Sequence, residues 1–168
     1  PNNSGAGTGL YRSTDGGDSW SRISTMIVDS VISPNAIDFT STRGISTVVV
    51  EPGNSQTMYV ATTSAMLGMT GVRGGQTQTT GYLQPRVGLY KTENRGQAWT
   101  LIWVPPLDPV IPANPNIGVG VGDTMFGVRH VKLDPRNSKI IYATAWNNAI
   151  HRSAPSLENG DASFKPVF

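Results

Sequence analysis

The stretch GLYRSTDGGDSW at residues 9–20 is closely matched by GLYKTENRGQAW at residues 88–99. A second pair of stretches also repeats, because VVVEPGNSQTMYVAT at residues 48–62 resembles VKLDPRNSKIIYATA at residues 131–145. Self-similarity on this scale is typical of a repeat architecture, in which one supersecondary unit recurs along the chain. The repeats therefore decide the fold before any single segment does.

The segments that carry these repeats are typical of short β-strands. They are rich in Val, Thr and Tyr, they are bounded by Gly, Pro and Asn, and no stretch shows a sustained helical period. A partial third copy of the first motif begins with the predicted strand at residues 149–153 and ends near Phe164. The predicted strands are residues 45–51, 57–63, 87–93, 97–104, 128–134, 140–146 and 149–153.

One repeat unit is predicted to contain four antiparallel strands. The first two are joined by a Glu/Asp-Pro-x-Asn-Ser turn, and the last two by a Ser-x-Asp-x-Gly-x-x-Trp turn. Four-stranded sheets that recur along a chain are the blades of a β-propeller. The predicted fold class is therefore all-β, with the sheets arranged as part of a propeller.

The turn between the last two strands resembles the Asp-box, also called the BNR repeat. The second copy has Asn where the motif has Asp, and the third copy keeps Asn159, Gly160 and Phe164 at slipped spacing. The resemblance implies membership of a group of propellers that includes bacterial sialidases, xyloglucanase-like glycoside hydrolases, sortilin-type receptors and a photosystem-assembly protein. The motif is specific for the fold and not for a function. The positions that carry the two better copies are Ser13, Asp15, Gly17, Trp20, Thr92, Asn94, Gly96 and Trp99.

The residues of the Asp-box are predicted to have a structural role. A short Asp or Asn side chain can hydrogen-bond backbone N–H groups two residues on, and glycine accepts a positive φ. The tryptophans can place their rings in the gap between neighbouring sheets. Because these roles explain every residue of the motif, we interpret Asp15 as a stabiliser of its turn and not as a catalyst or a metal ligand.

The number of repeats predicts a segment of a larger propeller. Residues 8–24 supply the end of one blade, residues 45–104 a complete blade, and residues 128–168 most of a third. Closed propellers use about 4–8 blades. We therefore expect the chain to contact the rest of the propeller or neighbouring protein subunits.

Composition narrows the class of partner. Lys and Arg number 13 against 11 Asp and Glu, a net charge of +2, so no basic stripe for nucleic acid is expected. No run of about 18 apolar residues predicts a membrane span. Cysteine is absent, which excludes disulfides and thiolate ligands. We expect no cofactor or metal, and the family and the Ser/Thr/Asn/Gln-rich composition favour an extracytoplasmic location.

Three long loops, at residues 26–44, 64–86 and 105–127, are predicted to lie on one face and to form the binding surface. Aromatic, amide and guanidinium groups in or beside these loops could bind a glycan or a protein partner, and packing between loop and blade is the alternative role of the rings. The candidate binding residues are Tyr82, Arg86, Trp103, Asn114 and Phe126.

Glycoside hydrolysis is the alternative function. Most such enzymes need two carboxyl groups about 5–5.5 Å or about 6.5–9.5 Å apart, and Asp38 and Asp123 are the best-placed candidates. No spacing of arginines singles out a sialidase triad, and residues 12–17 only superficially resemble the signature of the xyloglucanase-like enzymes. We therefore predict a non-catalytic binding or scaffold segment.

Overall fold

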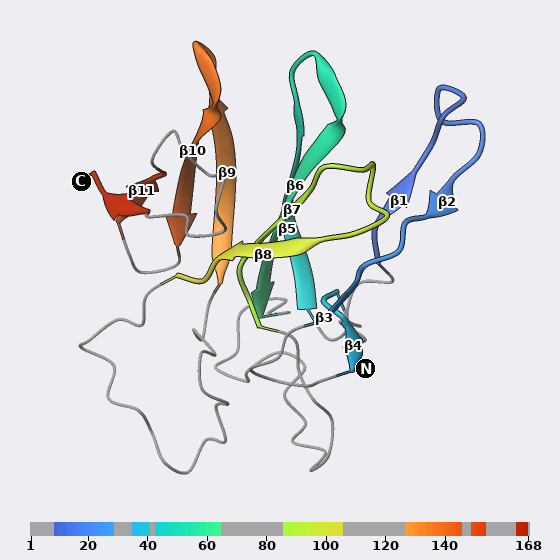
Figure 1. Cartoon of the computed structure of the whole chain (residues 1–168), viewed down its shortest axis with the longest axis horizontal. Helices are drawn as coiled ribbons and strands as arrows, with labels where there is room; N and C mark the ends of the chain where they lie inside the picture. The colour runs from blue at the N-terminus through green and yellow to red at the C-terminus, as the bar shows by residue number, and fades with distance from the viewer. Residues whose placement is uncertain are drawn as a thin grey trace, which may run out of the picture.

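The computed structural model describes residues 9–28, 35–40, 43–64, 86–105, 127–145, 149–153 and 164–167. All of the regular structure in these ranges is β, which confirms the predicted all-β class (Figure 1). Nothing in these ranges has the length and apolar character of a membrane-crossing helix. The strands are β1 (Tyr11–Arg12), β2 (Ser21–Arg22), β3 (Met26–Val28), β4 (Ala36–Asp38), β5 (Arg43–Glu51), β6 (Asn54–Ser64), β7 (Leu89–Thr92), β8 (Thr100–Trp103), β9 (Val128–Asp134), β10 (Asn137–Ala145), β11 (Ile150–Arg152) and β12 (Lys165–Pro166).

The predicted four-stranded unit occurs twice. Strands β5, β6, β7 and β8 form one antiparallel sheet in chain order, which we call the central sheet. Strands β9 to β12 form a second such sheet, which we call the C-terminal sheet. Strands β1 and β2 form a separate two-stranded sheet that corresponds to β7 and β8. None of the described sheets closes on itself, so the propeller arrangement stays a prediction.

The two four-stranded sheets share their irregularities as well as their topology. In the central sheet, Ile45 pairs with Thr62 and Thr47 with Ala61, so one residue of β5 is bulged. The C-terminal sheet repeats this bulge at the matching positions, where Val128 pairs with Ala145. A β-bulge is a defined feature that re-aims side chains. Its recurrence supports the internal repeat that the sequence indicates.

Each face of the central sheet packs on a neighbouring unit, and successive residues of a strand contribute to opposite faces. One face packs on the N-terminal elements through a cluster of Leu10, Ile27, Phe39, Met58, Val60, Tyr90 and Trp99. The other face packs on the C-terminal sheet through Tyr59, Ala61, Leu89, Ile102, Trp103, Val128, Val131, Ile141, Ala143 and Ala145. The three units are therefore stacked sheet on sheet along the chain.

The segment from residue 26 to residue 44, expected as a loop, contains regular structure. Strands β3 and β4 pair antiparallel, and Ile27 lies opposite Ile37. Burial explains this difference, since Ile27 and Phe39 are both buried against the central sheet. The aromatic ring of Phe39 stacks on Tyr90 with ring centroids 4.0 Å apart.

The turns of three hairpins point the same way. The β1–β2, β5–β6 and β9–β10 turns all lie at the top of Figure 1. Two of these are Glu/Asp-Pro-x-Asn-Ser turns and one is an Asp-box turn. Three of the short, formulaic turns therefore lie at the same end of the molecule in this view.

Candidate functional site

In the first Asp-box hairpin, between β1 and β2, the polar side chains of Ser13 and Asp15 form hydrogen bonds within the hairpin itself. Ser13 Oγ donates to Asp15 Oδ1 over 2.6 Å and accepts the Gly17 N–H over 2.8 Å. Asp15 Oδ1 also accepts the Ser19 N–H over 3.0 Å. The hydroxyls of Ser13 and Ser19 hold the pKa of Asp15 far below its usual range. The carboxylate is therefore an ionised acceptor for its own turn.

The second hairpin, between β7 and β8, repeats these contacts with different side chains. Thr92 Oγ1 donates to Asn94 Oδ1 over 2.9 Å and accepts the Gly96 N–H over 3.0 Å. Asn94 Oδ1 accepts the Ala98 N–H over 2.8 Å. An amide thus replaces the carboxylate and keeps its backbone contact, and only the hydrogen bond from the Ser19 hydroxyl to Asp15 Oδ2 has no counterpart at Ala98. Because the turn requires an acceptor and not a charge or a proton donor, this comparison supports a structural role for the Asp-box.

Both turns pass through the left-handed region at two successive residues. Gly16 and Gly17 have φ of 74° and 106°, and Arg95 and Gly96 have φ of 59° and 87°. A Cβ on Gly96 would lie 2.2 Å from Ile23 Cγ2, whereas a Cβ on Gly17 would meet nothing within 4 Å. Gly96 therefore serves both the turn and a close sheet-to-sheet contact.

The two Asp-box tryptophans have different surroundings. Trp99 is 7% exposed, contacts Phe39 edge-on with centroids 5.4 Å apart, and donates its indole N–H to the Ser24 carbonyl over 2.8 Å. Trp20 is 62% exposed and donates its N–H to Gly17 of its own hairpin. The tryptophan of the motif is thus buried in the second copy and exposed to solvent in the first.

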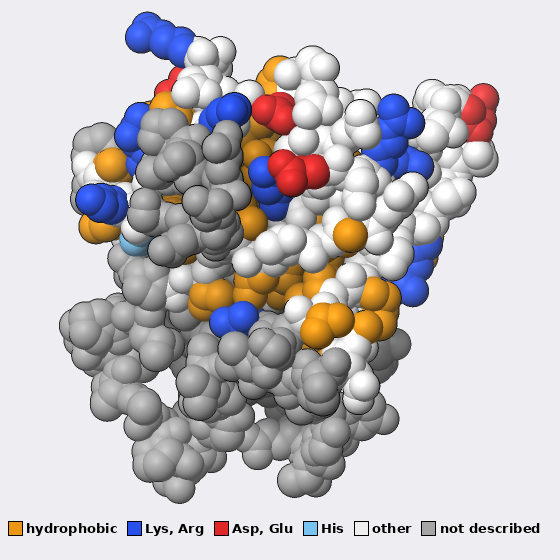
Figure 2. Space-filling view, viewed as in Figure 1, with side chains coloured by type: hydrophobic (Ala, Val, Ile, Leu, Met, Phe, Trp, Pro, Cys, Tyr) orange, Lys and Arg blue, Asp and Glu red, His pale blue; other side chains and the backbone are white. Residues whose placement is uncertain are grey.

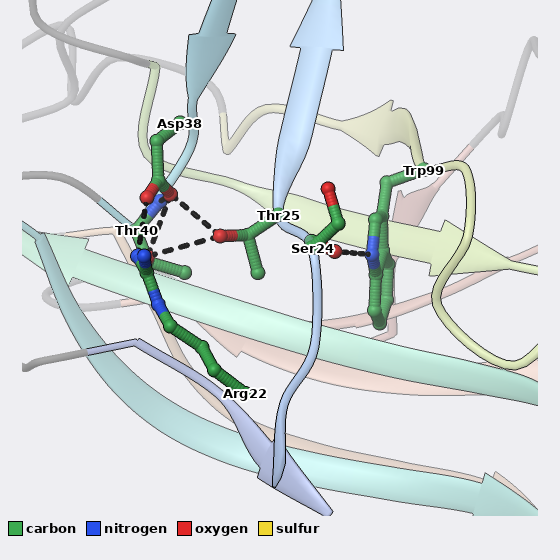
Figure 3. Close-up of polar contacts among 6 residues, drawn as sticks. All are labelled: Arg22, Ser24, Thr25, Asp38, Thr40 and Trp99. Atoms are coloured by element: carbon green, nitrogen blue, oxygen red, sulfur yellow. Dashed lines mark hydrogen bonds and ion pairs between the residues drawn. The ribbon is translucent and has the colours of Figure 1, made fainter.

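Asp38, the candidate catalytic carboxylate, lies in a compact polar cluster (Figure 3). Its Oδ1 accepts hydrogen bonds from the hydroxyls of Thr25 and Thr40 over 2.6 and 2.7 Å, and from the Thr40 N–H over 2.8 Å. Its Oδ2 accepts Arg22 Nη2 over 2.7 Å. The cluster joins the end of β2 to both strands of the β3–β4 pair.

The cluster keeps Asp38 ionised. Burial raises the pKa of Asp38, but the hydrogen bonds from Thr25 and Thr40 and the charge of Arg22 together outweigh it, so the pKa lies below its ordinary value. A general acid needs a raised pKa instead. The geometry gives Asp38 an anchoring role, and a catalytic role could only be that of a base or a nucleophile.

Two candidate binding residues are described besides Asp38. The Trp103 ring is 9% exposed and stacks on Phe164 with centroids 4.5 Å apart, while His151 lies 5.1 Å away. These contacts give Trp103 a packing role between sheets. Arg86 is half-buried, and its carbonyl accepts the Tyr90 hydroxyl.

The other candidates lie outside the described residues. They are Tyr82, Asn114, Asp123 and Phe126. The pairing of the two candidate catalytic carboxylates, Asp38 and Asp123, therefore stays a prediction.

The partners of Asp38 were missed by sequence reasoning. Arg22, Thr25 and Thr40 form no motif, and only the return of the chain through β3 and β4 brings them together. The Asp-Phe-Thr order at residues 38–40 carries a weak signal, because Thr40 closes onto Asp38 two residues back. Such an Asp side chain bonded to a backbone N–H two residues on is a common local turn.

The described residues show no concentration of metal ligands. In the described ranges, no group of three or more His, Asp or Glu side chains gathers. In the view of Figure 2, Lys and Arg side chains are scattered among acidic and neutral ones. This distribution agrees with the small net charge of +2.

The chain matches no protein-family model, and no curated protein is similar enough to it to be matched.

Proposed function

We propose that the chain is a non-catalytic binding or scaffold segment of an extracytoplasmic Asp-box β-propeller. In this proposal the stacked sheets are blades, and the long loops dock a protein or glycan partner. The observation that carries the proposal is the identity of the two Asp-box hairpins. Asp15 and Asn94 make the same backbone contacts, so the most conspicuous polar motif of the chain supports the fold.

The surroundings of Asp38 also favour binding over catalysis. Its oxygens accept four hydrogen bonds from Arg22, Thr25 and Thr40, and its pKa is lowered. Glycoside hydrolysis needs one carboxyl group with a raised pKa as the acid. The pKa values of the Asp15, Asp38, Glu51 and Asp134 carboxyl groups are lowered instead.

A glycan array followed by assays of reducing-end release tests the proposal. We expect glycan or protein binding without release of reducing ends. Replacing residues 65–85 by a short Gly/Ser linker should abolish binding, whereas Asp15→Asn, which changes a turn outside that segment, should preserve it. Release by the wild-type chain that Asp38→Asn or Asp123→Asn abolishes would establish the hydrolase instead.

A further inference from the structure

The β1–β2 pair is half of the repeat unit. Its equivalent, β7–β8, belongs to a four-stranded sheet in which β7 also pairs with β6. In the described part of the chain, β1 pairs with β2 alone. Among the described residues, one edge of β1 therefore lacks the neighbour that the same edge of β7 has.

Two valines of the central sheet are exposed at positions that are covered in the other copy of the repeat. Val48 and Val50, on β5, are 45% and 48% exposed. Their equivalents in the C-terminal sheet are Val131, which is 2% exposed, and Leu133, which packs on the edge of the core. The same positions of the repeat are thus covered in one sheet and open in the other.

The C-terminal sheet, in which Val131 is buried, shows which residues cover this position of the repeat. Val131 lies in one cluster with Tyr59 and Ala61 of β6, and Val49 of β5 packs against that cluster. Strands β5 and β6 are the first two strands of the preceding sheet. Among the strands of the central sheet, β9 lies chiefly beside β5 and β6, so the residues that cover Val131 come mainly from a two-stranded hairpin.

Two hydrogen bonds, one near each end of β5, also join the central sheet to the C-terminal sheet. Ser46 Oγ donates to the Val128 carbonyl over 2.6 Å, and Ser138 Oγ donates to Glu51 Oε1 over 2.6 Å. In the repeat, the positions equivalent to Val128 and Ser138 are Ile45 and Ser55. Ser55 is exposed.

We propose that the free edge of β1, together with Val48 and Val50, is the docking site of a two-stranded antiparallel β-hairpin of this same repeat, lying outside the 168 residues. One strand of the hairpin extends the β1–β2 sheet by main-chain hydrogen bonds. The two strands together cover the two valines, with a hydroxyl side chain on the Ile45 carbonyl and a turn carboxylate on Ser55.

A second copy of the chain does not supply this hairpin. Its own hairpins of this type, β5–β6 and β9–β10, already pair with β7 and β11. The inference uses the repeat that also underlies the proposed function, but it does not depend on the loops. Absence of glycan binding would leave it unaffected.

The experiment adds a hairpin of the proposed type to the chain. The sequence of residues 43–64 is fused to the N-terminus of the full chain through a flexible Gly/Ser linker, which raises its effective concentration to about millimolar. The control fusion carries the same residues in scrambled order. Backbone amide exchange at residues 10–13 and the urea unfolding midpoint are measured for both fusions and for the unfused chain.

We expect the intact fusion to slow exchange at residues 10–13 at least about tenfold and to raise the unfolding midpoint, because open edges exchange through local fluctuations. Introducing Val48→Lys and Val50→Lys into the chain itself, with the fused copy of residues 43–64 left unchanged, should remove both effects. The same pair of changes should alter the unfused chain little, since both side chains are exposed.

Two results would overturn the inference. One is an intact fusion that behaves like the scrambled one. The other is slow exchange at residues 10–13 in the unfused chain that disappears on dilution, which would assign this face to self-association.

Discussion

The indole N–H of Trp99 donates a 2.8 Å hydrogen bond to the carbonyl of Ser24, across the boundary between two sheets (Figure 3). The next residue, Thr25, donates its hydroxyl to Asp38. The two consecutive residues thus bind an Asp-box hairpin on one side and the β3–β4 pair on the other. This relationship explains how a turn motif can hold separate sheets together.

Trp99→Ala should destabilise the chain far more than Trp20→Ala. Removing a buried aromatic ring costs about 3–5 kcal/mol, whereas Trp20 is 62% exposed and its loss should cost under about 1 kcal/mol. Urea unfolding followed by circular dichroism measures both. Equal losses for the two variants would show that the boundary does not depend on Trp99.

Gly96→Ala should cost more than Gly17→Ala. Both positions have positive φ, which costs a residue with a Cβ about 1–2 kcal/mol. Only at Gly96 does the new Cβ also meet Ile23, at 2.2 Å from Cγ2.

A double-mutant cycle separates the two causes. The additional cost of Gly96→Ala should shrink when Ile23→Ala is already present, and Gly17→Ala should be insensitive to Ile23→Ala. An unchanged cost for Gly96→Ala in the Ile23→Ala background would mean that backbone strain alone is responsible.

Strands β5 to β10 could be predicted from the sequence because each contains Val, Thr or Tyr and is bounded by turn residues. Residues 128–134 were predicted as a strand and form β9 with the same bounds. The strand predicted from residue 97 begins at Thr100, because Gln97 still donates its N–H to Asn94 within the turn. The β3–β4 pair was missed, since three residues per strand give too little pattern and burial against Tyr90 stabilises it.

The cluster around Asp38 could not be predicted. Its partners are ordinary Thr and Arg residues without a shared motif, and their contacts depend on tertiary folding. The burial of Trp103 was equally hidden, because a tryptophan at the edge of a loop can stack on a sugar or pack on a neighbour. Phe164, its stacking partner, comes from the most divergent copy of the Asp-box.

Asp15→Asn should leave stability near that of the wild type, and Asp15→Ala should lower the unfolding midpoint. An asparagine can accept the Ser19 N–H as Asn94 accepts that of Ala98, whereas alanine offers no acceptor. Asn94→Asp and Asn94→Ala form the matched pair in the second hairpin. If both alanine variants kept the wild-type midpoint, the Asp-box side chain would not stabilise its turn.

Asp38→Asn should reduce the dependence of stability on acid pH. The pKa of Asp38 is lowered in the folded chain from its ordinary 3.8, so the unfolded chain binds the proton more readily. The stability contributed by the ionised group is therefore complete above pH about 5 and is lost as pH falls through the folded-state pKa. Asparagine keeps an acceptor for Thr25 and Thr40 but loses the charge that faces Arg22, a change worth about 1 kcal/mol near neutral pH.

Subtracting the variant's stability from that of the wild type, measured by urea unfolding between pH 2 and pH 7, isolates this contribution from that of the other carboxylates with lowered pKa values. We expect the difference to be largest near neutral pH, to fall in acid, and to weaken in high salt because the Arg22 side chain is 52% exposed. A difference that grows as the pH falls would mean that Asp38 is protonated in the folded chain, and would return it to consideration as a general acid.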